Sequence, residues 1–213
     1  MRTAILISGR GSNMKALIDA QRQQPVDFEI ALVISNRPSA AGLKVAEAAG
    51  IDTVVIDHKD YQDREPFDRA LDQALSEARI DLVCLAGFMR ILSPWFTESW
   101  QDRVLNIHPS LLPSFKGLRT HERAIAAGVR LHGCTVHLVR PDLDDGPILV
   151  QGMVPVLQED TAETLAARVL KVEHRCYPLA LQLLASGRAR IEGDRVMVEG
   201  GMPALITLSE GDM

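Results

Sequence analysis

Short apolar segments alternate with helical patterns through the first half of this chain, and that alternation restricts the fold more than any other feature. The strand-length segments 3–8 and 82–86 are apolar at successive positions, so both of their faces are expected to be buried. The intervening segment 64–79 carries apolar residues at the spacing of a helix face. Strands that are buried on both faces and joined by helices pair in parallel. We therefore predict an α/β fold, with a Rossmann-like, mostly parallel, twisted sheet and helices on both of its faces.

The pattern changes in the C-terminal part, where antiparallel strands are expected. Two apolar segments, 133–139 and 148–156, are separated by residues 141–147, which are too few for a helical crossover. An amphipathic helix over 161–185 and a small hairpin around Gly193 are predicted to follow. The strands predicted for the parallel part are 3–8, 30–35, 53–56, 82–86 and 104–107, and the helices are 12–23, 41–49 and 64–79.

Length and charge limit the organisation of the chain and its partners. With 213 residues the chain can bury one substantial core, so we expect a single domain over 1–198 and a poorly ordered tail over 199–213. A net charge of −5 argues against partners such as nucleic acids or anionic membranes. No apolar run approaches the roughly 20 residues that span a bilayer, and the N-terminus continues directly into a strand. We therefore expect a cytoplasmic protein, either a monomer or a homodimer.

The cysteines and histidines do not suggest a metal site. Cys84, Cys134 and Cys176 are widely spaced within apolar segments, which is typical of buried free thiols in a reducing compartment. His132 and Cys134 would share one face of their strand and His137 the opposite face, so no tetrahedral ligand set emerges. We predict that the chain binds no metal.

A glycine-rich turn follows the first predicted strand. It contains Gly9 and Gly11, and Ser12 and Asn13 open a helix at once. Glycines let a backbone approach an anion closely, and the N–H groups of a first helical turn point toward it. The turn therefore suits a phosphate group. Two alternatives are a dinucleotide-binding turn, which prefers a further glycine where Met14 stands, and a tight turn without a ligand.

An amide, an imidazole and a carboxylate form a second candidate site. Asn106 and His108 lie two residues apart at the end of the fifth predicted strand, which places both on one side of that strand. An Asn side chain can donate to a carbonyl oxygen that gains negative charge, and a His can carry a proton. Asp144 could hold the imidazole and favour its charged form. Each residue alone is commonly structural, but together they suit acyl-type transfer to an amine.

Four segments together resemble one known family. They are residues 9–13 (Gly-Arg-Gly-Ser-Asn), 85–92 (Leu-Ala-Gly-Phe-Met-Arg-Ile-Leu), 106–113 (Asn-Ile-His-Pro-Ser-Leu-Leu-Pro) and 143–147 (Leu-Asp-Asp-Gly-Pro). On these segments the chain resembles the phosphoribosylglycinamide formyltransferases, the folate-dependent enzymes of de novo purine synthesis. The third segment is shared with other formyl-tetrahydrofolate enzymes, whereas the Gly-Ser-Asn turn is typical of this branch.

The resemblance implies transfer of a formyl group from the co-substrate 10-formyltetrahydrofolate to the amine of 5′-phosphoribosylglycinamide. Asn106 would polarise the formyl oxygen, His108 would donate and accept the proton, and Asp144 would raise the pKa of His108. The residues implied to bind the phosphate and ribose of the substrate are Gly11, Ser12, Asn13 and a turn at 170–173, namely Leu170, Lys171, Val172 and Glu173. The residues implied to bind folate are Arg64, Met89, Arg90, Ile91, Leu92, Asn106, Arg140, Pro141, Asp142, Leu143 and Asp144.

Other functions remain open at this point. Leu170 departs from the family, which commonly has a polar residue there. A methionyl-tRNA formyltransferase would carry a further C-terminal domain and a basic surface. A formyltetrahydrofolate hydrolase would use the same three catalytic groups with water as the nucleophile, and typically has a further N-terminal domain. A catalytically silent folate-binding module would not need Asn106, His108 and Asp144, and Met14 disfavours an NADP oxidoreductase.

Overall fold

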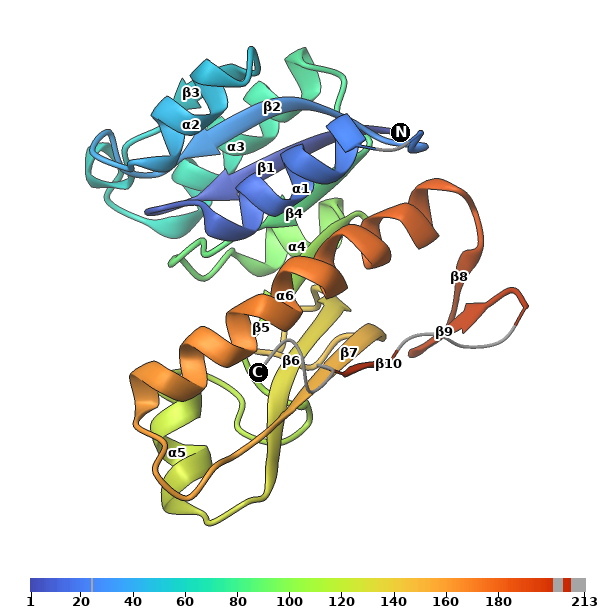
Figure 1. The fold of residues 1–213 in the computed structure, drawn as a ribbon. Helices are drawn as coiled ribbons and strands as arrows, with labels where there is room; N and C mark the ends of the chain where they lie inside the picture. Colours follow the sequence, from blue (N-terminus) through green and yellow to red (C-terminus); the bar gives the residue numbers. More distant parts are fainter. Residues whose placement is uncertain (24, 201–204, 208–213) are drawn as a thin grey trace. The chain divides into compact units, whose positions relative to one another are not determined.

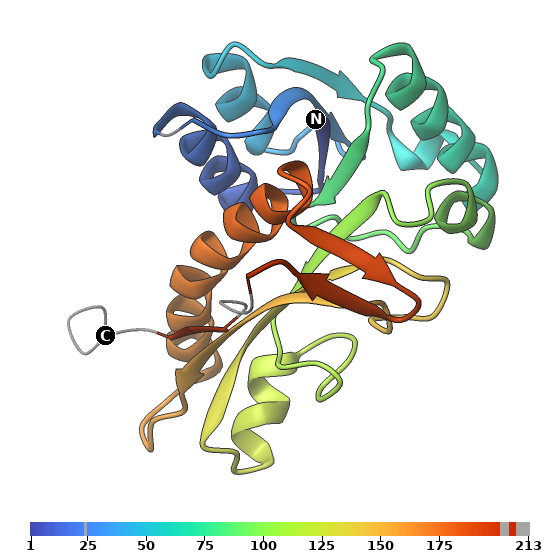
Figure 2. The ribbon, with the colours of Figure 1, turned by 90° about the vertical axis from the view of Figure 1, so that its right-hand side faces the viewer.

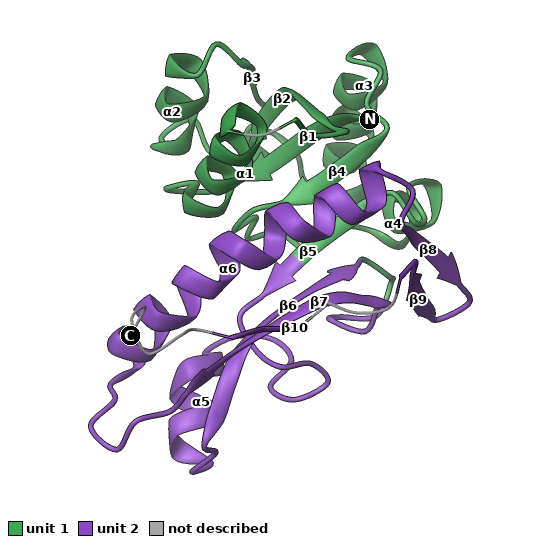
Figure 3. Ribbon diagram, turned by 45° about the vertical axis from the view of Figure 1, so that its right-hand side comes forward, with its two compact units in different colours: residues 1–106, 139–141 green, residues 107–138, 142–213 purple. Residues whose placement is uncertain are grey.

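The computed structural model describes residues 1–23, 25–200 and 205–207, and the chain forms two compact units (Figure 1, Figure 3). Unit 1 comprises residues 1–106 and 139–141, and unit 2 comprises residues 107–138 and 142–213. Strand β5 (Val104–His108) begins in unit 1 and ends in unit 2.

The sheet of unit 1 is parallel throughout, in the order β5-β4-β1-β2-β3. Every residue of β1 after Arg2 is buried, as expected for a strand that is covered on both faces. The chain runs outward from β1 to β3 and then returns to β4 on the other side of β1. Ligands of such sheets bind beyond the carboxyl ends of the strands at this change of direction. The strands are β1 (Arg2–Ile7), β2 (Glu29–Ser35), β3 (Asp52–Val55) and β4 (Leu82–Leu85).

Helices cover both faces of this sheet (Figure 2). On one face α3 (Arg64–Glu77) and α4 (Pro94–Ser99) pack against the strands, in a core that includes Leu6, Phe67 and Phe96. Helices α1 (Ser12–Gln23) and α2 (Gly42–Ala48) pack on the other face. A 3₁₀ turn, η1 (His58–Asp60), follows β3. The alternating side chains of β1, β2 and β4 thus contribute to both faces, which is the reason for their continuous apolar runs, whereas the edge strand β3 is mostly exposed.

Unit 2 is built on an antiparallel pair, β6 (Leu131–Leu138) and β7 (Ile148–Pro155). The long helix α6 (Ala162–Ala185) packs on both strands. Its approach is close because β7 contains Gly152, where a Cβ atom would lie 2.0 Å from the Val172 side chain. Unit 2 also contains α5 (Thr120–Ala126), the hairpin β8 (Ala189–Glu192) and β9 (Arg195–Val198), and strand β10 (Leu205–Thr207), which runs parallel to β7.

The predicted fold class is confirmed: the sheet is mostly parallel, with helices on both faces and an antiparallel pair in the C-terminal part. Each predicted strand and helix is present with bounds within two residues of the prediction. The sequence did not predict α4, α5, η1 or β10. In the tail, residues 205–207 form a strand, whereas 201–204 and 208–213 lie outside the described residues. The single domain over 1–198 stays a prediction. Among the described helices none is long and apolar enough to cross a membrane.

The N-terminus of α6 is stabilised by an ion pair that makes stability depend on pH. Arg168 donates to both oxygens of Asp160 (2.7 and 2.8 Å), whose side chain is 3% exposed. These hydrogen bonds lower the pKa of Asp160 to about 2. Because the folded-state pKa lies below the unfolded one, the contribution is complete above about pH 4 and disappears as the pH falls toward 2.

We expect Asp160→Asn to lower the free energy of unfolding by about 1–2 kcal/mol at neutral pH. Urea denaturation of both proteins between pH 7 and pH 3 checks this, and the difference should shrink below about pH 4. Glu159→Gln, an exposed acid next to it, is the matched control and should change stability little. A constant difference across this pH range would assign the effect to lost packing instead of lost charge.

Candidate active site

The turn after β1 has the geometry of an anion site. Gly11 has a φ of +72°, in the left-handed region that favours glycine, and its carbonyl accepts from the N–H of Lys15 (2.8 Å) in the first turn of α1. Helix α1 begins at Ser12, and Asn13 is buried. The backbone N–H groups of this first turn have no partner within the helix, and the helix dipole favours negative charge beside them. Gly11 thus lies in the turn itself, and Ser12 and Asn13 lie in the first turn of α1.

The buried Ser8 connects this turn to the loop after β4. Its hydroxyl donates to Asn36 Oδ1 (2.6 Å) and accepts from the backbone N–H of Met89 (2.8 Å). Ser8, Asn36 and Met89 follow β1, β2 and β4, so the hydrogen bonds join the carboxyl ends of three neighbouring strands. No local pattern in the sequence distinguishes Ser8, because a serine at the end of a strand is commonly a turn former.

The loop after β4 exposes apolar side chains. Met89 and Ile91 expose 66% and 54% of their surface, whereas Leu92 is buried in the core of unit 1. The Arg90 guanidinium lies over the Phe67 ring, 4.6 Å from its centroid. Arg64, the first residue of α3, is exposed. The loop therefore presents two exposed apolar side chains, Met89 and Ile91, which suit contact with a flat ring.

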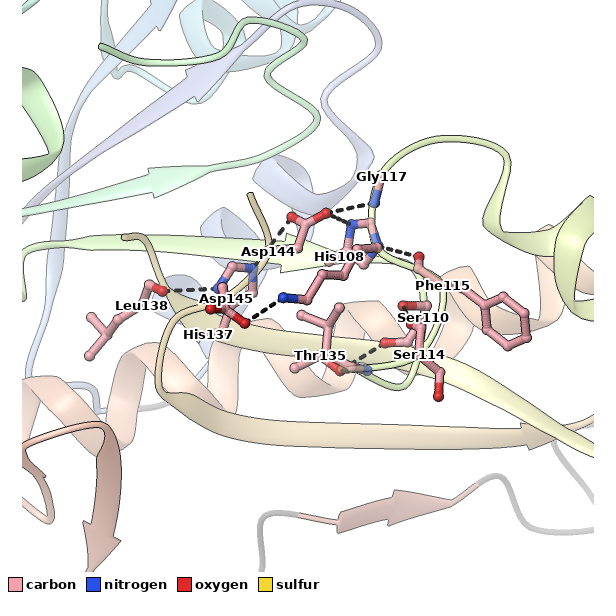
Figure 4. Close-up of polar contacts among 12 residues, drawn as sticks. His108, Ser110, Ser114, Phe115, Gly117, Thr135, His137, Leu138, Asp144 and Asp145 are labelled. Atoms are coloured by element: carbon pink, nitrogen blue, oxygen red, sulfur yellow. Dashed lines mark hydrogen bonds and ion pairs between the residues drawn. The ribbon is translucent and has the colours of Figure 1, made fainter. Parts of the chain in front are cut away.

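Strand β5 carries both Asn106 and His108, two residues apart. Within unit 2, His108 is buried and both of its ring nitrogens contact oxygen acceptors (Figure 4). Nδ1 lies 3.4 Å from Asp144 Oδ2, and Nε2 lies 3.1 Å from the carbonyl oxygen of Phe115. Both ring nitrogens thus face oxygen atoms, and these two contacts fix the orientation of the His108 ring.

Asp144 is fixed by the backbone and lies between two histidines (Figure 4). Its Oδ2 accepts from the Gly117 N–H (2.8 Å), and its Oδ1 lies 3.9 Å from His137 Nε2. Its φ of +51° lies in the left-handed region, which Asp and Asn tolerate better than most residues. Burial lowers the pKa of His137, so this histidine favours the neutral form.

The loop after His108 is held by β6. Thr135 donates to the Ser110 carbonyl (2.7 Å) and accepts from the Leu112 N–H (3.0 Å), and the Leu112-Pro113 peptide bond is cis. Lys116 forms an ion pair with Asp145, next to the catalytic candidate Asp144. Sequence reasoning missed Phe115, Lys116, Gly117, Thr135 and the position of His137 as neighbours of this pair, because no local pattern in the sequence signals these contacts.

Residues 140–143 differ in their surroundings. Arg140 is paired with Asp102 (2.5 Å), and Pro141, Asp142 and Leu143 are exposed. Leu170, Lys171, Val172 and Glu173, which the resemblance implies for the ribose, lie in the middle of α6, within the helix predicted over 161–185. The amphipathic pattern runs unbroken through these positions, so the helix continues. Val172 packs against Gly152, Glu173 is buried and Lys171 is exposed.

In the part of the chain that the structure describes, no group of three His, Cys, Asp or Glu could hold a metal ion.

This chain is similar in sequence and in fold to formyl transferases. The model of the formyl transferase family matches residues 1–181. The phosphoribosylglycinamide formyltransferase of Escherichia coli (strain K12) is 42% identical over 200 residues, which cover 94% of each chain. The crystal structure of phosphoribosylglycinamide formyltransferase from Anaplasma phagocytophilum has a TM-score of 0.91 at 44% identity and covers 98% of this chain and 99% of that one. The trifunctional purine biosynthetic protein adenosine-3 of Bos taurus is 55% identical over 190 residues. This chain spans about a fifth of the length of that relative (19%), and the match covers 89% of this chain.

Proposed function

Because the chain belongs to the formyl transferase family, we propose that it transfers the formyl group of 10-formyltetrahydrofolate to the amine of 5′-phosphoribosylglycinamide, in purine biosynthesis. The observation that carries this proposal is the pair of His108 and Asp144, buried and 3.4 Å apart, with Asn106 on the strand that positions His108. Full-length similarity to proteins named for this activity supports the same substrates.

In the proposed reaction the substrate amine attacks the formyl carbon directly. A carbon–nitrogen bond forms and the formyl oxygen gains negative charge, which the Asn106 amide N–H and the His108 imidazolium stabilise. His108 then mediates the transfer of the proton that the amine loses to N10 of the folate as the bond from the formyl carbon to N10 breaks. The products are formylglycinamide ribonucleotide and tetrahydrofolate, and the proposed route uses no metal. Asp144 keeps the imidazolium charged and oriented.

The two substrates are proposed to bind through groups of different chemistry. Gly11, Ser12 and Asn13 would hold the substrate phosphate at the N-terminus of α1, and Glu173 would accept hydrogen bonds from the ribose hydroxyls. Met89 and Ile91 would contact the pterin, because they are exposed apolar residues beside Arg64 and Arg90. Backbone groups of 140–144 would bind the edge of the ring. We further propose a cytoplasmic protein that acts on these small molecules as a monomer or homodimer.

Formyl transfer from 10-formyltetrahydrofolate tests the proposal, with phosphoribosylglycinamide compared with buffer alone. Tetrahydrofolate formation that requires the ribonucleotide is the expected result. Deformylation without an acceptor would indicate a hydrolase. Neither reaction, in a folded sample that binds folate, would indicate a silent binding module.

The phosphate site can be tested by adding one methyl group. We expect Gly11→Ala to weaken phosphoribosylglycinamide binding about tenfold, because alanine disfavours the φ of +72° and its Cβ would lie 3.0 Å from Met14 Cε and 3.3 Å from Gly42 Cα. Gly9→Ala is the matched control, because a Cβ there meets nothing within 4 Å. Isothermal titration with the ribonucleotide measures both. Equal affinities for the two variants would place the phosphate elsewhere.

A further inference from the structure

The segment that joins β4 to α4 is held at two points by buried side chains of other elements. Near one end, the Met89 N–H donates to Ser8 Oγ (2.8 Å). At the other end, the Ser93 N–H donates to Asp68 Oδ2 (2.6 Å). Ser8 is 5% exposed and Asp68 is fully buried, so neither contact is open to competition from bulk water. Between the two points lie Arg90 and Ile91, which are proposed to bind folate, and Leu92, which is buried in the core.

Asp68 is an acidic residue at a fully buried position of α3, which is unusual. It lies on the face of α3 that packs in the core of unit 1, next to Phe67, one turn before Leu71 and two turns before Leu75. Burial raises the pKa of this carboxyl, whereas the hydrogen bonds with Ser93 and the charges of Arg90 and Arg64 lower it. A buried carboxylate is unfavourable unless strong partners compensate for its lost hydration. The partners of Asp68 all belong to the proposed folate site or to its border.

Two contacts fix the side chain of Arg90, one with α3 and one with the residue before it. Its guanidinium lies over Phe67, and it donates to the Asp63 carbonyl (3.4 Å) just before α3 begins. Asp68 is thus hydrogen-bonded to the backbone that ends the segment and attracts the cation in its middle. The Met89 and Ile91 side chains stay exposed on a backbone that is fixed on either side of them.

We propose that Ser8 and Asp68 are positioning residues for the folate substrate. They fix the backbone of 89–93 before the ligand arrives, so that binding does not have to order this segment. The inference rests on the proposed function and extends it to two residues that need not touch the ligand. Loss of either contact should therefore weaken folate binding and leave the second substrate and the chemical step unaffected.

The test compares Asp68→Ala, Asp68→Asn and Ser8→Ala with the wild type. We expect Asp68→Ala and Ser8→Ala each to raise the KM for 10-formyltetrahydrofolate about tenfold, the size expected when a hydrogen bond to a buried acceptor is lost. The turnover at saturating folate and the KM for phosphoribosylglycinamide should stay close to wild type. Asp68→Asn should restore most of the affinity, because its amide oxygen can still accept from the Ser93 N–H.

Asp72→Ala is the matched control. Asp72 lies one turn further along α3 and also binds α4, because its Oδ1 accepts from the Trp100 indole N–H (2.8 Å). This variant removes a contact between α3 and α4 away from the segment 89–93. It should lower the melting temperature without raising the folate KM, which separates positioning from general loosening of the two helices.

Direct measurements distinguish failure of the inference from failure of the proposed function. Fluorescence titration with 5-formyltetrahydrofolate reports affinity, and hydrogen exchange at the Ser93 amide reports its contact with Asp68. If the wild type does not bind this folate, the proposed function fails. If the wild type binds and Asp68→Ala and Ser8→Ala match it, or if Asp72→Ala raises KM equally, the positioning role is overturned.

Discussion

Replacement of His108 by alanine is expected to reduce turnover by about 10²- to 10⁴-fold, the usual contribution of a positioned proton carrier. The imidazole contacts Asp144 at one nitrogen and the Phe115 carbonyl at the other, and alanine removes both contacts. Affinity for phosphoribosylglycinamide should stay close to wild type, because the proposed phosphate site at 11–13 belongs to another loop. Steady-state kinetics give the turnover, and isothermal titration of the ribonucleotide gives the affinity.

Two further variants make this result interpretable. His108→Asn fills more of the buried site than alanine, so a matching loss of turnover in both would exclude a simple cavity effect. His121→Asn is the control, because His121 is a partly buried histidine of the same unit that packs on His132, with ring centroids 5.1 Å apart. It should retain most of its turnover. Near-normal turnover of a folded His108→Ala protein would contradict the assignment of His108 as the proton carrier.

Local patterns in the sequence predicted the parts of the site that depend on single elements. The apolar run of β1, the glycine turn and the start of α1 are adjacent in the chain, so their order alone located the turn at Gly11–Asn13. The positions of Asn106 and His108 on one strand followed from the two-residue period. Helix α6 begins one residue after its predicted start, because Thr161 caps it.

The features that the sequence did not predict depend on contacts between distant residues or on rare backbone conformations. Phe115 has a φ of +56°, which nothing in its residue type indicates, and its carbonyl accepts from His108 across seven residues of the chain. An Asp on an amphipathic helix is commonly solvated, whereas Asp68 is buried because the loop before α4 brings the Ser93 N–H to it. Helices α4 and α5 have six and seven residues, too few for a clear 3.6-residue period.

Replacement of Asp144 by asparagine is expected to lower turnover about tenfold. The Asp144 carboxylate lies 3.4 Å from His108 Nδ1, and a neutral amide there holds the imidazole less strongly than a carboxylate does. A tenfold loss of turnover corresponds to about 1.4 kcal/mol of lost transition-state stabilisation. Steady-state kinetics at saturating concentrations of both substrates measure it.

Asparagine is the appropriate substitute because it preserves the geometry. It tolerates the φ of +51°, and an amide oxygen in place of Oδ2 still accepts from the Gly117 N–H. The amide nitrogen then replaces Oδ1 beside His137, whose neutral ring can accept from it. Asp144→Ala lacks all of these features, so it should lose more turnover than Asp144→Asn and also melt at a lower temperature.

Asp145→Asn is the control for the change in net charge. It alters the charge of the chain by the same amount one residue away, but Asp145 is 55% exposed and pairs with Lys116 instead of a histidine. Screening by water and salt should leave its turnover close to wild type. An equal loss in both variants would point to the overall charge of the turn. Wild-type turnover of a folded Asp144→Asn protein would contradict the role of the Asp144 carboxylate in holding His108.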